Sequence, residues 1–593
     1  MGDDLLFLYR KIGMKKILVF LKDYKKESVI APLFKMLEAI FELIVPLVVA
    51  QIIDIGISNG DTSYIFSRCG VLFLLAIIGL TCAVCAQYFA ARAAVGFAAQ
   101  LRSALFAHIQ KLSYADMDEI GTNTLITRMT SDVNQLQSGV NMVLRLFMRS
   151  PFVVFGAMIM AFTVDVKAAL VFVIAIPLLS IVVFGVMLIT MPMYKKVQSA
   201  LDKVLGKTRE NLVGVSVIRA FNKEEKEIEE FNESNEILTN MQLLVGRISA
   251  LMNPVTLLIV NIAALVIIWI GAKQVFDGIL TQGEVVALVS YMSQILVELV
   301  KLANLIILIT KAVACGNRVA AVLEKEPAIN EKNRTPIIGD ADAPMITFKD
   351  VAMHYGKSTE EALSNISFTA KRGQTIGIIG GTGDGKSTLV NLIPRFYEVS
   401  KGAVLIEGVD VRDYPLTQLR QKVGVVPQKA VLFHGTIAEN LRWGNPYATE
   451  EELMHAIELA QASDIIREKE EGLQYIIEQG GRNLSGGQKQ RLTIARALVN
   501  NPDILILDDS ASALDYATDA KLRSALQTIA ENRTIIIVSQ RTSSIQHADL
   551  ILVLEDGEAV GTGTHTELLG SCAVYKEIYD SQFHSEKGGV AHG

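Results

Sequence analysis

Three long stretches without any charged residue place the strongest constraint on how this chain folds. Residues 69–91, 168–194 and 248–272 contain no Asp, Glu, Lys or Arg. A helix needs about 20 apolar residues, each rising 1.5 Å, to cross the hydrocarbon core of a bilayer. Because a soluble helix carries polar side chains on its exposed face, these three stretches predict membrane-spanning helices.

A second set of segments is long and apolar but includes a few charges, and we expect these segments to span the membrane as well: residues 28–57, 141–163 and 284–314. In the first of them, Lys35, Glu38 and Glu42 are spaced so that they share one face of a helix. We expect them to pair with one another and turn away from lipid, with contact to a transported molecule as the alternative. The sequence thus predicts a six-helix transmembrane domain over residues 28–314.

An even number of spans leaves both ends of this domain on the same side of the membrane. The cytoplasmic N-terminal segment, residues 1–27, carries seven Lys or Arg residues, whereas the loops at 54–68, 165–167 and 273–283 carry one each. This bias predicts cytoplasmic termini by the positive-inside rule. We expect no cleavable signal, and the multi-pass architecture without a targeting peptide suggests a bacterial cytoplasmic membrane.

Two long loops on the predicted cytoplasmic side, at about 93–140 and 195–247, have helix-forming compositions. Each contains a short break, at residues 113–123 and 214–222. From the residues alone, a solvated turn and a short lateral helix are both open at these breaks.

The second half of the chain has a different character. Residues 315–345 are polar and contain proline, as expected of a linker, and from residue 346 short apolar strands alternate with helical patterns. This indicates an α/β domain. The formal net charge of −6 gives no basic field of the kind that binds nucleic acid, so we expect no nucleic-acid partner.

A phosphate-binding motif begins the chemistry of this domain. The apolar run at residues 376–379 predicts a buried strand, GGTGDGKS follows at 380–387, and a helical pattern starts at Thr388. In a P-loop of this kind backbone N–H groups surround the phosphates, the lysine reaches the β- and γ-phosphates, and the hydroxyl binds Mg²⁺. The predicted phosphate-binding residues are Gly380, Gly381, Thr382, Gly383, Asp384, Gly385, Lys386, Ser387 and Thr388.

Two further motifs follow. The strand-like run at residues 504–507 ends in Asp508 and Asp509, at the edge of a parallel sheet where ligands bind, and we predict Asp508 as the magnesium partner. Helix capping is the alternative role for such carboxylates. The sequence LSGGQKQR at 484–491 precedes a helical pattern and offers a second anion cradle, formed by Ser485, Gly486, Gly487 and Gln488.

These motifs, in this order, resemble the nucleotide-binding domain of ATP-binding cassette (ABC) proteins over residues 346–580, followed by a tail at 581–593. The resemblance implies that Tyr355 stacks on adenine, that Gln428 is the Q-loop residue near Mg²⁺, and that Ser512 and Asp515 belong to the D-loop. It also implies that the second cradle closes over ATP held by a partner's P-loop. Tyr355 as a strand aromatic and Gln428 as a surface amide remain the alternatives.

With six spans ahead of the cassette, the whole chain resembles a half-size ABC exporter with a type IV transmembrane fold. In that family two such chains pair, and short helices in the cytoplasmic loops dock on the cassettes. The breaks at 113–123 and 214–222 then resemble these coupling helices.

Two residues depart from the family pattern. Members with full activity have a Glu directly after the Walker B aspartate, a position that Asp508 matches here, and a switch His further on. This chain has Asp509 and Gln540 at these two places. Asp is shorter by one methylene, about 1.5 Å, and misplacement by about 1 Å can cost about 100-fold in rate. Gln540 can donate a hydrogen bond but carries no titratable proton. We therefore predict ATP–Mg²⁺ binding with impaired hydrolysis at the catalytic positions Asp509, Gln540 and Gln428.

The second cradle, in contrast, resembles the signature motif of ABC proteins, and its residues from Leu484 to Gln488 are intact. This asymmetry predicts a heterodimer of the multidrug type, in which this chain completes a competent site on a partner subunit that bears Glu and His; a homodimer that tolerates Asp is the alternative. The leading function is export of hydrophobic or amphipathic compounds, such as drugs, lipids or peptides. A lipid flippase and a channel-like subunit gated by ATP remain open, and the substrate is not identified by the sequence.

Overall fold

The computed structural model describes residues 16–329, 335–356, 358, 360–511, 513–531 and 533–587. The first 15 residues of the N-terminal segment, Ser512 of the predicted D-loop and the end of the tail lie outside these ranges. The chain divides into two compact units. One comprises residues 1–110 and 123–325, and the other comprises residues 111–122 and 326–593.

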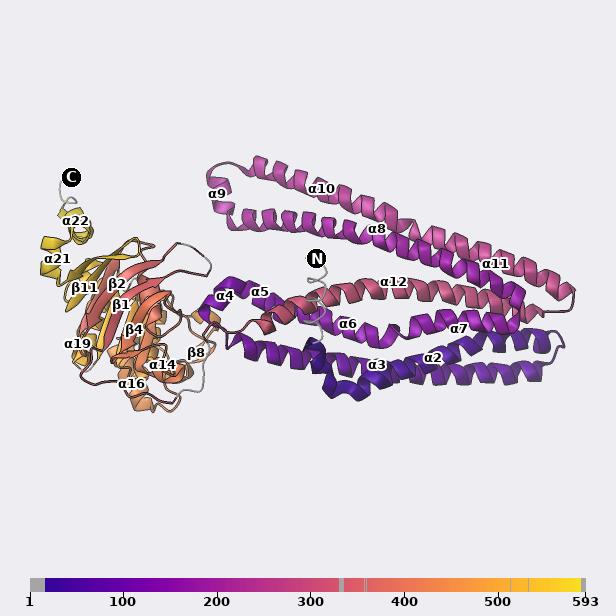
Figure 1. Ribbon diagram of the computed structural model, residues 1–593, viewed down its shortest axis with the longest axis horizontal. Helices are drawn as coiled ribbons and strands as arrows, with labels where there is room; N and C mark the ends of the chain where they lie inside the picture. Colours follow the sequence, from indigo (N-terminus) through magenta and orange to yellow (C-terminus); the bar gives the residue numbers. More distant parts are fainter. Residues whose placement is uncertain are drawn as a thin grey trace. The chain divides into compact units, whose positions relative to one another are not determined.

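The first unit is built of long helices, and six stretches within the described residues are long and apolar enough to cross a membrane. The predicted six-span domain is therefore confirmed. Helices that pack against each other include α2 with α3, and α8 with α10 and α11 (Figure 1). The bounds are α2 (Lys25–Gln51), α3 (Thr62–Ile109), α6 (Val133–Leu146), α7 (Arg149–Val164), α8 (Val166–Val213), α10 (Glu224–Ala250), α11 (Met252–Phe276) and α12 (Gln282–Glu324).

The helices differ from the sequence prediction at two places. The third span is not one continuous helix, because α6 ends at Leu146 and α7 starts at Arg149. The last span runs on to Glu324, so residues 315–324, which we assigned to the linker, are helical. Two π-helical turns also interrupt the bundle, at Ile52–Ile57 and Arg128–Asp132.

Small side chains form much of the contact between these helices. Buried alanines line α2, α7 and α8, and a Cβ on Gly139 would lie 2.4 Å from the Cβ of Ala312 on α12. Small residues of this kind let helix backbones approach closely, and close packing holds helices together in a membrane, where the hydrophobic effect does not.

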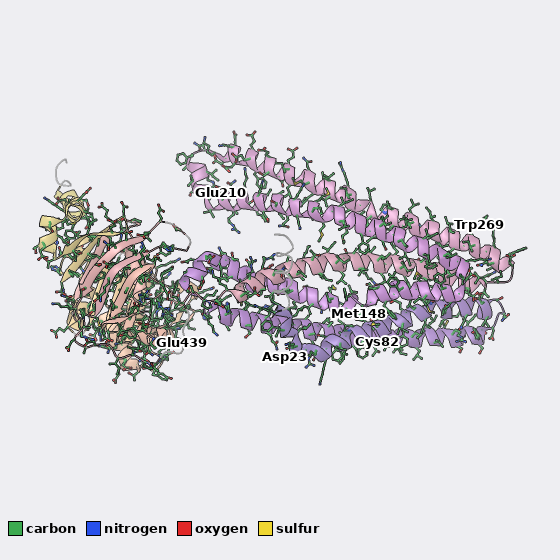
Figure 2. The ribbon with its side chains drawn as sticks, in the orientation of Figure 1. Asp23, Cys82, Met148, Glu210, Trp269 and Glu439 are labelled. Atoms are coloured by element: carbon green, nitrogen blue, oxygen red, sulfur yellow. The ribbon has the colours of Figure 1, made fainter. Side chains whose placement is uncertain are left out.

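Two labelled side chains show how the helices are lined (Figure 2). Cys82 lies within α3, and Trp269 is exposed on α11 with the Lys273 amine over its ring.

A buried cluster of charges joins α2, α7 and α12. The guanidinium of Arg149 donates to Glu298 at 2.6 Å and to Glu42 at 2.6 Å, and the side chains of Arg149 and Glu298 are 7% and 3% exposed. The predicted pair on α2 is confirmed, since Lys35 donates to Glu38 at 2.6 Å. Glu42, however, pairs with Arg149 of α7 rather than with its helix neighbours.

The second unit contains an α/β cassette with two sheets (Figure 1). The larger sheet has the order β12-β11-β3-β10-β9-β6, with β12 antiparallel and the others parallel, and the smaller antiparallel sheet has the order β2-β1-β4-β5. The strands of the larger sheet are β3 (Thr375–Gly380), β6 (Val423–Val426), β9 (Ile504–Asp508), β10 (Thr534–Val538), β11 (Leu550–Glu555) and β12 (Glu558–Gly563). Those of the smaller are β1 (Ile346–Met353), β2 (Leu363–Ala370), β4 (Lys401–Ile406) and β5 (Val409–Asp410).

Helices surround these two sheets. A separate two-stranded sheet is formed by β7 (Gly435–Thr436) and β8 (Ile476–Ile477). The main helices are α13 (Lys386–Leu392), α14 (Leu416–Lys422), α15 (Ile437–Leu441), α16 (Glu450–Leu459), α17 (Ser463–Arg467), α18 (Gly486–Val499), α19 (Tyr516–Ala530), α20 (Thr542–Ile545), α21 (His565–Ser571) and α22 (Ala573–Lys587). Because β3, β9 and β10 are adjacent and parallel, the residues that follow them meet at one edge of the sheet.

Both predicted breaks in the long loops contain a short helix. The first is α4 (Tyr114–Ile120), which starts with a capping box between Ser113 and Asp116, and the second is α9 (Val215–Ala220). The alternative of a plain turn is therefore wrong at both places. Helix α4 belongs to the same compact unit as the cassette, whereas α9 belongs to the unit of long helices.

Candidate nucleotide site

The P-loop lies between β3 and α13, as its sequence context predicts. Two of its glycines, Gly383 and Gly385, have positive φ values of 106° and 84°, which L side chains rarely adopt. A Cβ on Gly385 would also lie 2.6 Å from the Ala362 carbonyl oxygen. The loop can therefore be drawn tightly around a phosphate only because these positions are glycine.

A cavity of about 220 Å³ opens at the end of this loop. It gathers residues from four separate parts of the sequence: Thr382, Gly383, Gly385, Lys386, Ser387, Thr388, Gln428, Asp508, Asp509, Val538, Ser539 and Gln540. Ten of the predicted site residues thus lie together. Ser539 was missed by the sequence analysis, and its position directly before Gln540 is the signal that would have identified it.

The Lys386 amine is the buried cation of this cavity. It donates to the Gly380 carbonyl at 2.9 Å and also to the Gly381 carbonyl. Burial lowers the pKa of Lys386, and the neighbouring Asp384, Asp509 and Asp508 carboxylates oppose this shift. A buried ammonium that donates to two carbonyl oxygens of the loop fits a site for an anionic ligand such as a triphosphate.

Oxygen ligands suited to Mg²⁺ lie beside it. Ser387 Oγ donates to Asp508 Oδ1 at 3.0 Å, and Asp508 is only 8% exposed. Burial raises the pKa of Asp508, and the neighbouring Asp509 charge raises it further. The hydrogen bond from Ser387 acts in the opposite direction. Hydroxyl and carboxylate oxygens are what Mg²⁺ prefers, so Ser387 and Asp508, with Gln428 nearby, fit this cation.

The two residues that depart from the family pattern also face this cavity. Asp509 has a positive φ of 44°, its N–H donates to the Val538 carbonyl at 3.0 Å, and its carboxylate accepts from Gln428 Nε2 at 3.3 Å. Gln540 follows β10 and lines the same cavity. The site therefore holds a shorter carboxylate and an amide where a Glu and a His are expected.

Some predicted residues serve the loop rather than the cavity. The Asp384 carboxylate accepts a hydrogen bond from the Gly381 N–H, and Gly380 and Gly381 present their carbonyls to Lys386. The role of Asp384 is thus to hold the loop in shape.

The second anion cradle forms the start of α18, away from the P-loop cavity. Ser485 Oγ accepts from the Gln488 N–H at 3.2 Å, and Gln488 Oε1 accepts from the Ser485 N–H at 3.0 Å, while Gly486 is exposed. A Cβ on Gly487 would lie 3.3 Å from the Ala513 carbonyl of the predicted D-loop. None of these four residues lines the P-loop cavity of the same chain.

Asp515 caps α19 by accepting hydrogen bonds from the Thr518 N–H at 2.9 Å and the Thr518 hydroxyl at 2.8 Å, which lowers its pKa. Tyr355 lies apart from the P-loop cavity but is connected to it, because its hydroxyl is 2.8 Å from Thr388 Oγ1 on α13. Tyr355 is 41% exposed.

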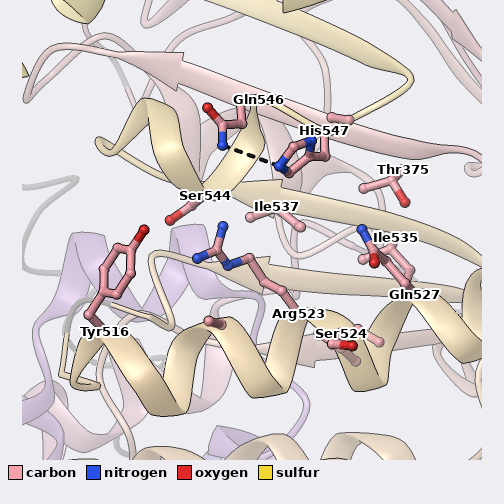
Figure 3. Close-up of a pocket in the computed structure, with 13 residues that line it drawn as sticks. Thr375, Tyr516, Arg523, Ser524, Gln527, Ile535, Ile537, Ser544, Gln546 and His547 are labelled. Carbon is pink, nitrogen blue, oxygen red and sulfur yellow. Dashed lines mark hydrogen bonds between the residues drawn. The ribbon is translucent and has the colours of Figure 1, made fainter. Parts of the chain in front are cut away.

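A second cavity, of about 290 Å³, lies between α19 and the sheet (Figure 3). Arg523 extends from α19 into it, and Tyr516, Ser544 and His547 stand around its rim (Figure 3). None of the predicted site residues lines this cavity.

Replacing Gly385 by Ala is expected to weaken ATP binding to the full chain by at least about tenfold. Forcing an L side chain into this left-handed conformation costs about 1–3 kcal/mol, and the added Cβ meets the Ala362 carbonyl. Equilibrium binding of labelled ATP measures this. Gly570→Ala is the control, since no atom lies within 4 Å of the added Cβ. Equal affinity of the Gly385 variant and the wild type would contradict the assignment.

A six-span unit joined to a P-loop cassette defines an ATP-driven membrane transporter. Family models described as "ABC transporter transmembrane region" and "ABC transporter" match residues 28–299 and 363–512. The chain is 37% identical over 573 residues to the uncharacterized ABC transporter ATP-binding protein YfiB of Bacillus subtilis, covering 97% of this chain and 99% of that protein. It is 33% identical over 481 residues to the ATP-dependent lipid A-core flippase of Desulfotalea psychrophila, covering 81% and 84%.

A solved structure of a bacterial Atm1-family ABC exporter with ATP bound has the same fold, with a TM-score of 0.77 at 24% identity, covering 94% of this chain and 98% of that one. The chain therefore belongs to the ABC transporters and carries a transmembrane domain and an ATP-binding domain in one polypeptide.

Proposed function

We propose that this chain is one subunit of a heterodimeric ABC exporter. Its own P-loop binds ATP and Mg²⁺ in a site impaired in hydrolysis, and its signature motif completes a competent site on a different subunit. The observation that carries the proposal is the composition of the P-loop cavity, in which Asp509 and Gln540 stand together with an otherwise complete set of nucleotide ligands. The signature helix α18 keeps its full capping box.

Different residues of the P-loop cavity bind different parts of ATP–Mg²⁺. Backbone N–H groups of the loop donate to phosphate oxygens, and the Lys386 amine exchanges its carbonyl contacts for the β- and γ-phosphates. Ser387, Asp508 and Gln428 would hold Mg²⁺, which supplies neutralisation of the phosphate charge. Tyr355 supports the adenine base by stacking.

Hydrolysis is impaired because neither Asp509 nor Gln540 is suited to activate the attacking water. Asp509 reaches about 1.5 Å less far than Glu, and Gln428 already donates to its carboxylate at 3.3 Å. Gln540 can donate a hydrogen bond to a phosphate oxygen but offers neither a positive charge nor a mobile proton. ATP is therefore expected to stay bound through many cycles of the partner's site.

The proposed substrates are hydrophobic or amphipathic compounds, including drugs, lipids and peptides. A homodimeric lipid flippase is the second candidate, favoured by the similarity to the lipid A-core flippase. The two candidates differ in what pairs with this chain, and not in how the cassette binds ATP.

The first experiment purifies the tagged full chain from its native membrane and identifies the subunit that copurifies with it. We expect a half-transporter that has Glu and His at the positions that Asp509 and Gln540 occupy in this chain. Replacing that partner's Walker B Glu by Gln should reduce ATP hydrolysis by the pair at least about 100-fold, because it removes the one competent general base. Asp509→Asn in this chain should reduce it less than about threefold.

Ser485→Arg in this chain is the matched test of the signature. It places a large cation where the partner's γ-phosphate is expected to bind, so hydrolysis should fall as far as in the partner's Glu variant while binding of ATP to this chain's P-loop persists. Rapid turnover by the purified chain alone, near the ~10 s⁻¹ typical of enzymes, would overturn the heterodimer and favour the flippase.

A further inference from the structure

Helix α4 is attached to the cassette through a cluster of aromatic rings. The ring of Tyr114 on α4 lies 4.7 Å from that of Phe396 and 6.2 Å from that of Tyr397, measured between centroids. The Tyr397 hydroxyl also donates to Asp118 Oδ2 on α4 at 2.6 Å. Tyr397 thus contacts α4 by both its ring and its hydroxyl.

Tyr397 also contacts Tyr355, the predicted adenine platform. The rings of Tyr397 and Tyr355 meet edge to face, with centroids 5.2 Å apart and an angle of 85° between their planes. The Tyr355 hydroxyl in turn lies 2.8 Å from Thr388 Oγ1, next to the P-loop. An unbroken series of contacts therefore runs from the P-loop helix through Tyr355 and Tyr397 to Asp118.

The two ends of this series differ, because α4 is fixed by hydrogen bonds and Tyr355 lies beside a cavity. Helix α4 is held by its capping box, and the Asp116 carboxylate also accepts from the Ala328 N–H at 3.0 Å. Tyr355, in contrast, is partly exposed and borders a cavity of about 550 Å³ that Tyr397, Asp118 and Ala328 also line. The cavity leaves space for the Tyr355 ring to move, and Tyr397 is the residue that contacts both this ring and α4.

The Tyr397 hydroxyl is suited to carry such a signal. Burial raises its pKa and the Asp118 carboxylate raises it further, so the hydroxyl stays protonated and remains a donor. A short hydrogen bond to a carboxylate is directional and of the strong, charge-assisted kind. A change in the tilt of the Tyr397 ring is therefore transmitted to α4 rather than absorbed by a loose contact.

We propose that Tyr397 is a positioning residue that couples occupancy of the adenine platform at Tyr355 to the order of helix α4. The inference rests on the proposed role of Tyr355 in ATP binding. It assigns to the base, and not to the phosphates, a separate influence on the helix that the family resemblance identifies as a coupling helix.

The test compares ATP with inorganic triphosphate, each with Mg²⁺, on the full chain in lipid nanodiscs. Hydrogen exchange of the amides in residues 114–120 is the readout. We expect saturating ATP to slow this exchange about three- to tenfold, and saturating triphosphate, which has no base, to slow it less than about 1.5-fold. In Tyr397→Phe the effect of ATP should fall below about 1.5-fold while ATP affinity stays within about threefold of the wild type.

Two substitutions at Asp118 separate transmission from packing. Asp118→Ala should behave like Tyr397→Phe, and Asp118→Asn should restore the effect of ATP, because its side-chain carbonyl still accepts from Tyr397. Tyr414→Phe is the control, since it removes a buried hydroxyl that donates to the Ile406 carbonyl at 3.1 Å and does not line the 550 Å³ cavity.

A purely structural role for Tyr397 predicts a different result. Tyr397→Phe would then speed exchange in α4 with and without ligand and leave the difference between ATP and triphosphate unchanged, which would overturn the proposal. Protection of α4 by triphosphate equal to that by ATP would overturn it as well. Equal affinities for ATP and triphosphate would instead show that Tyr355 does not bind the base, and the proposal would fall together with that assignment.

Discussion

The double variant Asp509→Glu, Gln540→His is expected to hydrolyse ATP about 100-fold faster than the wild-type chain. Glu advances the carboxylate by about 1.5 Å toward the attacking water, and misplacement on this scale costs about 100-fold. His adds a group that can carry a proton near neutral pH. Because the signature motif of this chain is intact, a pair of identical variant chains contains everything that the reaction needs. Phosphate release by the purified full chain measures the effect.

Matched variants make this result interpretable. Gln540→His alone should gain less than about tenfold, because the shorter carboxylate still limits the reaction. Adding Lys386→Met to the double variant should abolish the gain by removing the phosphate ligand. A double variant that pairs in the presence of ATP and yet hydrolyses it no faster than the wild type would refute the idea that these two positions limit turnover.

Arg149→Met is expected to lower the midpoint of thermal unfolding of the membrane unit by about 10 °C. The substitution leaves Glu298 and Glu42 without their shared cation, and Glu298 is almost fully buried. Breaking a buried ion pair by removing one partner costs about 3–5 kcal/mol. The midpoint can be followed by the loss of monodisperse protein on heating in detergent.

Neutralising the carboxylate as well should reverse much of this loss. The variant Arg149→Met, Glu298→Gln should regain at least half of the lost stability, because an uncharged amide is far less costly to bury than a carboxylate. Lys301→Met is the control, since the Lys301 side chain is 41% exposed where it pairs with Glu298. A single Arg149 variant as stable as the Lys301 variant would show that the cluster does not hold α2, α7 and α12 together.

The parts of the structure that sequence predicts well are those set by neighbouring residues. The strand before GGTGDGKS, the helix after it and the carboxylates at the end of β9 follow from short patterns with a direct physical cause. Uncharged runs of bilayer length likewise predicted spans without any tertiary information. Lys35 and Glu38 lie about one helical turn apart, so helical periodicity alone was enough to predict that they pair.

Other features depend on residues far apart in the chain. Arg149 binds Glu298 across 149 positions, and Tyr397 binds Asp118 across 279, so no local pattern indicates either contact. The break between α6 and α7 was also missed, although Pro151 signals it: proline has no N–H to donate to the Phe147 carbonyl four residues earlier, and its ring clashes with that carbonyl. The partner and the cytoplasmic orientation of the termini remain predictions.

The membership of α4 in the cassette unit has a practical consequence for work on isolated pieces of the protein. A fragment that starts at residue 326 would lack residues 111–122, which complete the unit but lie more than 200 positions upstream. Phe396 and Tyr397 would then lose the ring of Tyr114 and meet water. Such a fragment is expected to self-associate through this bare aromatic surface, and supplying the residues 111–122 peptide in trans should restore its solubility.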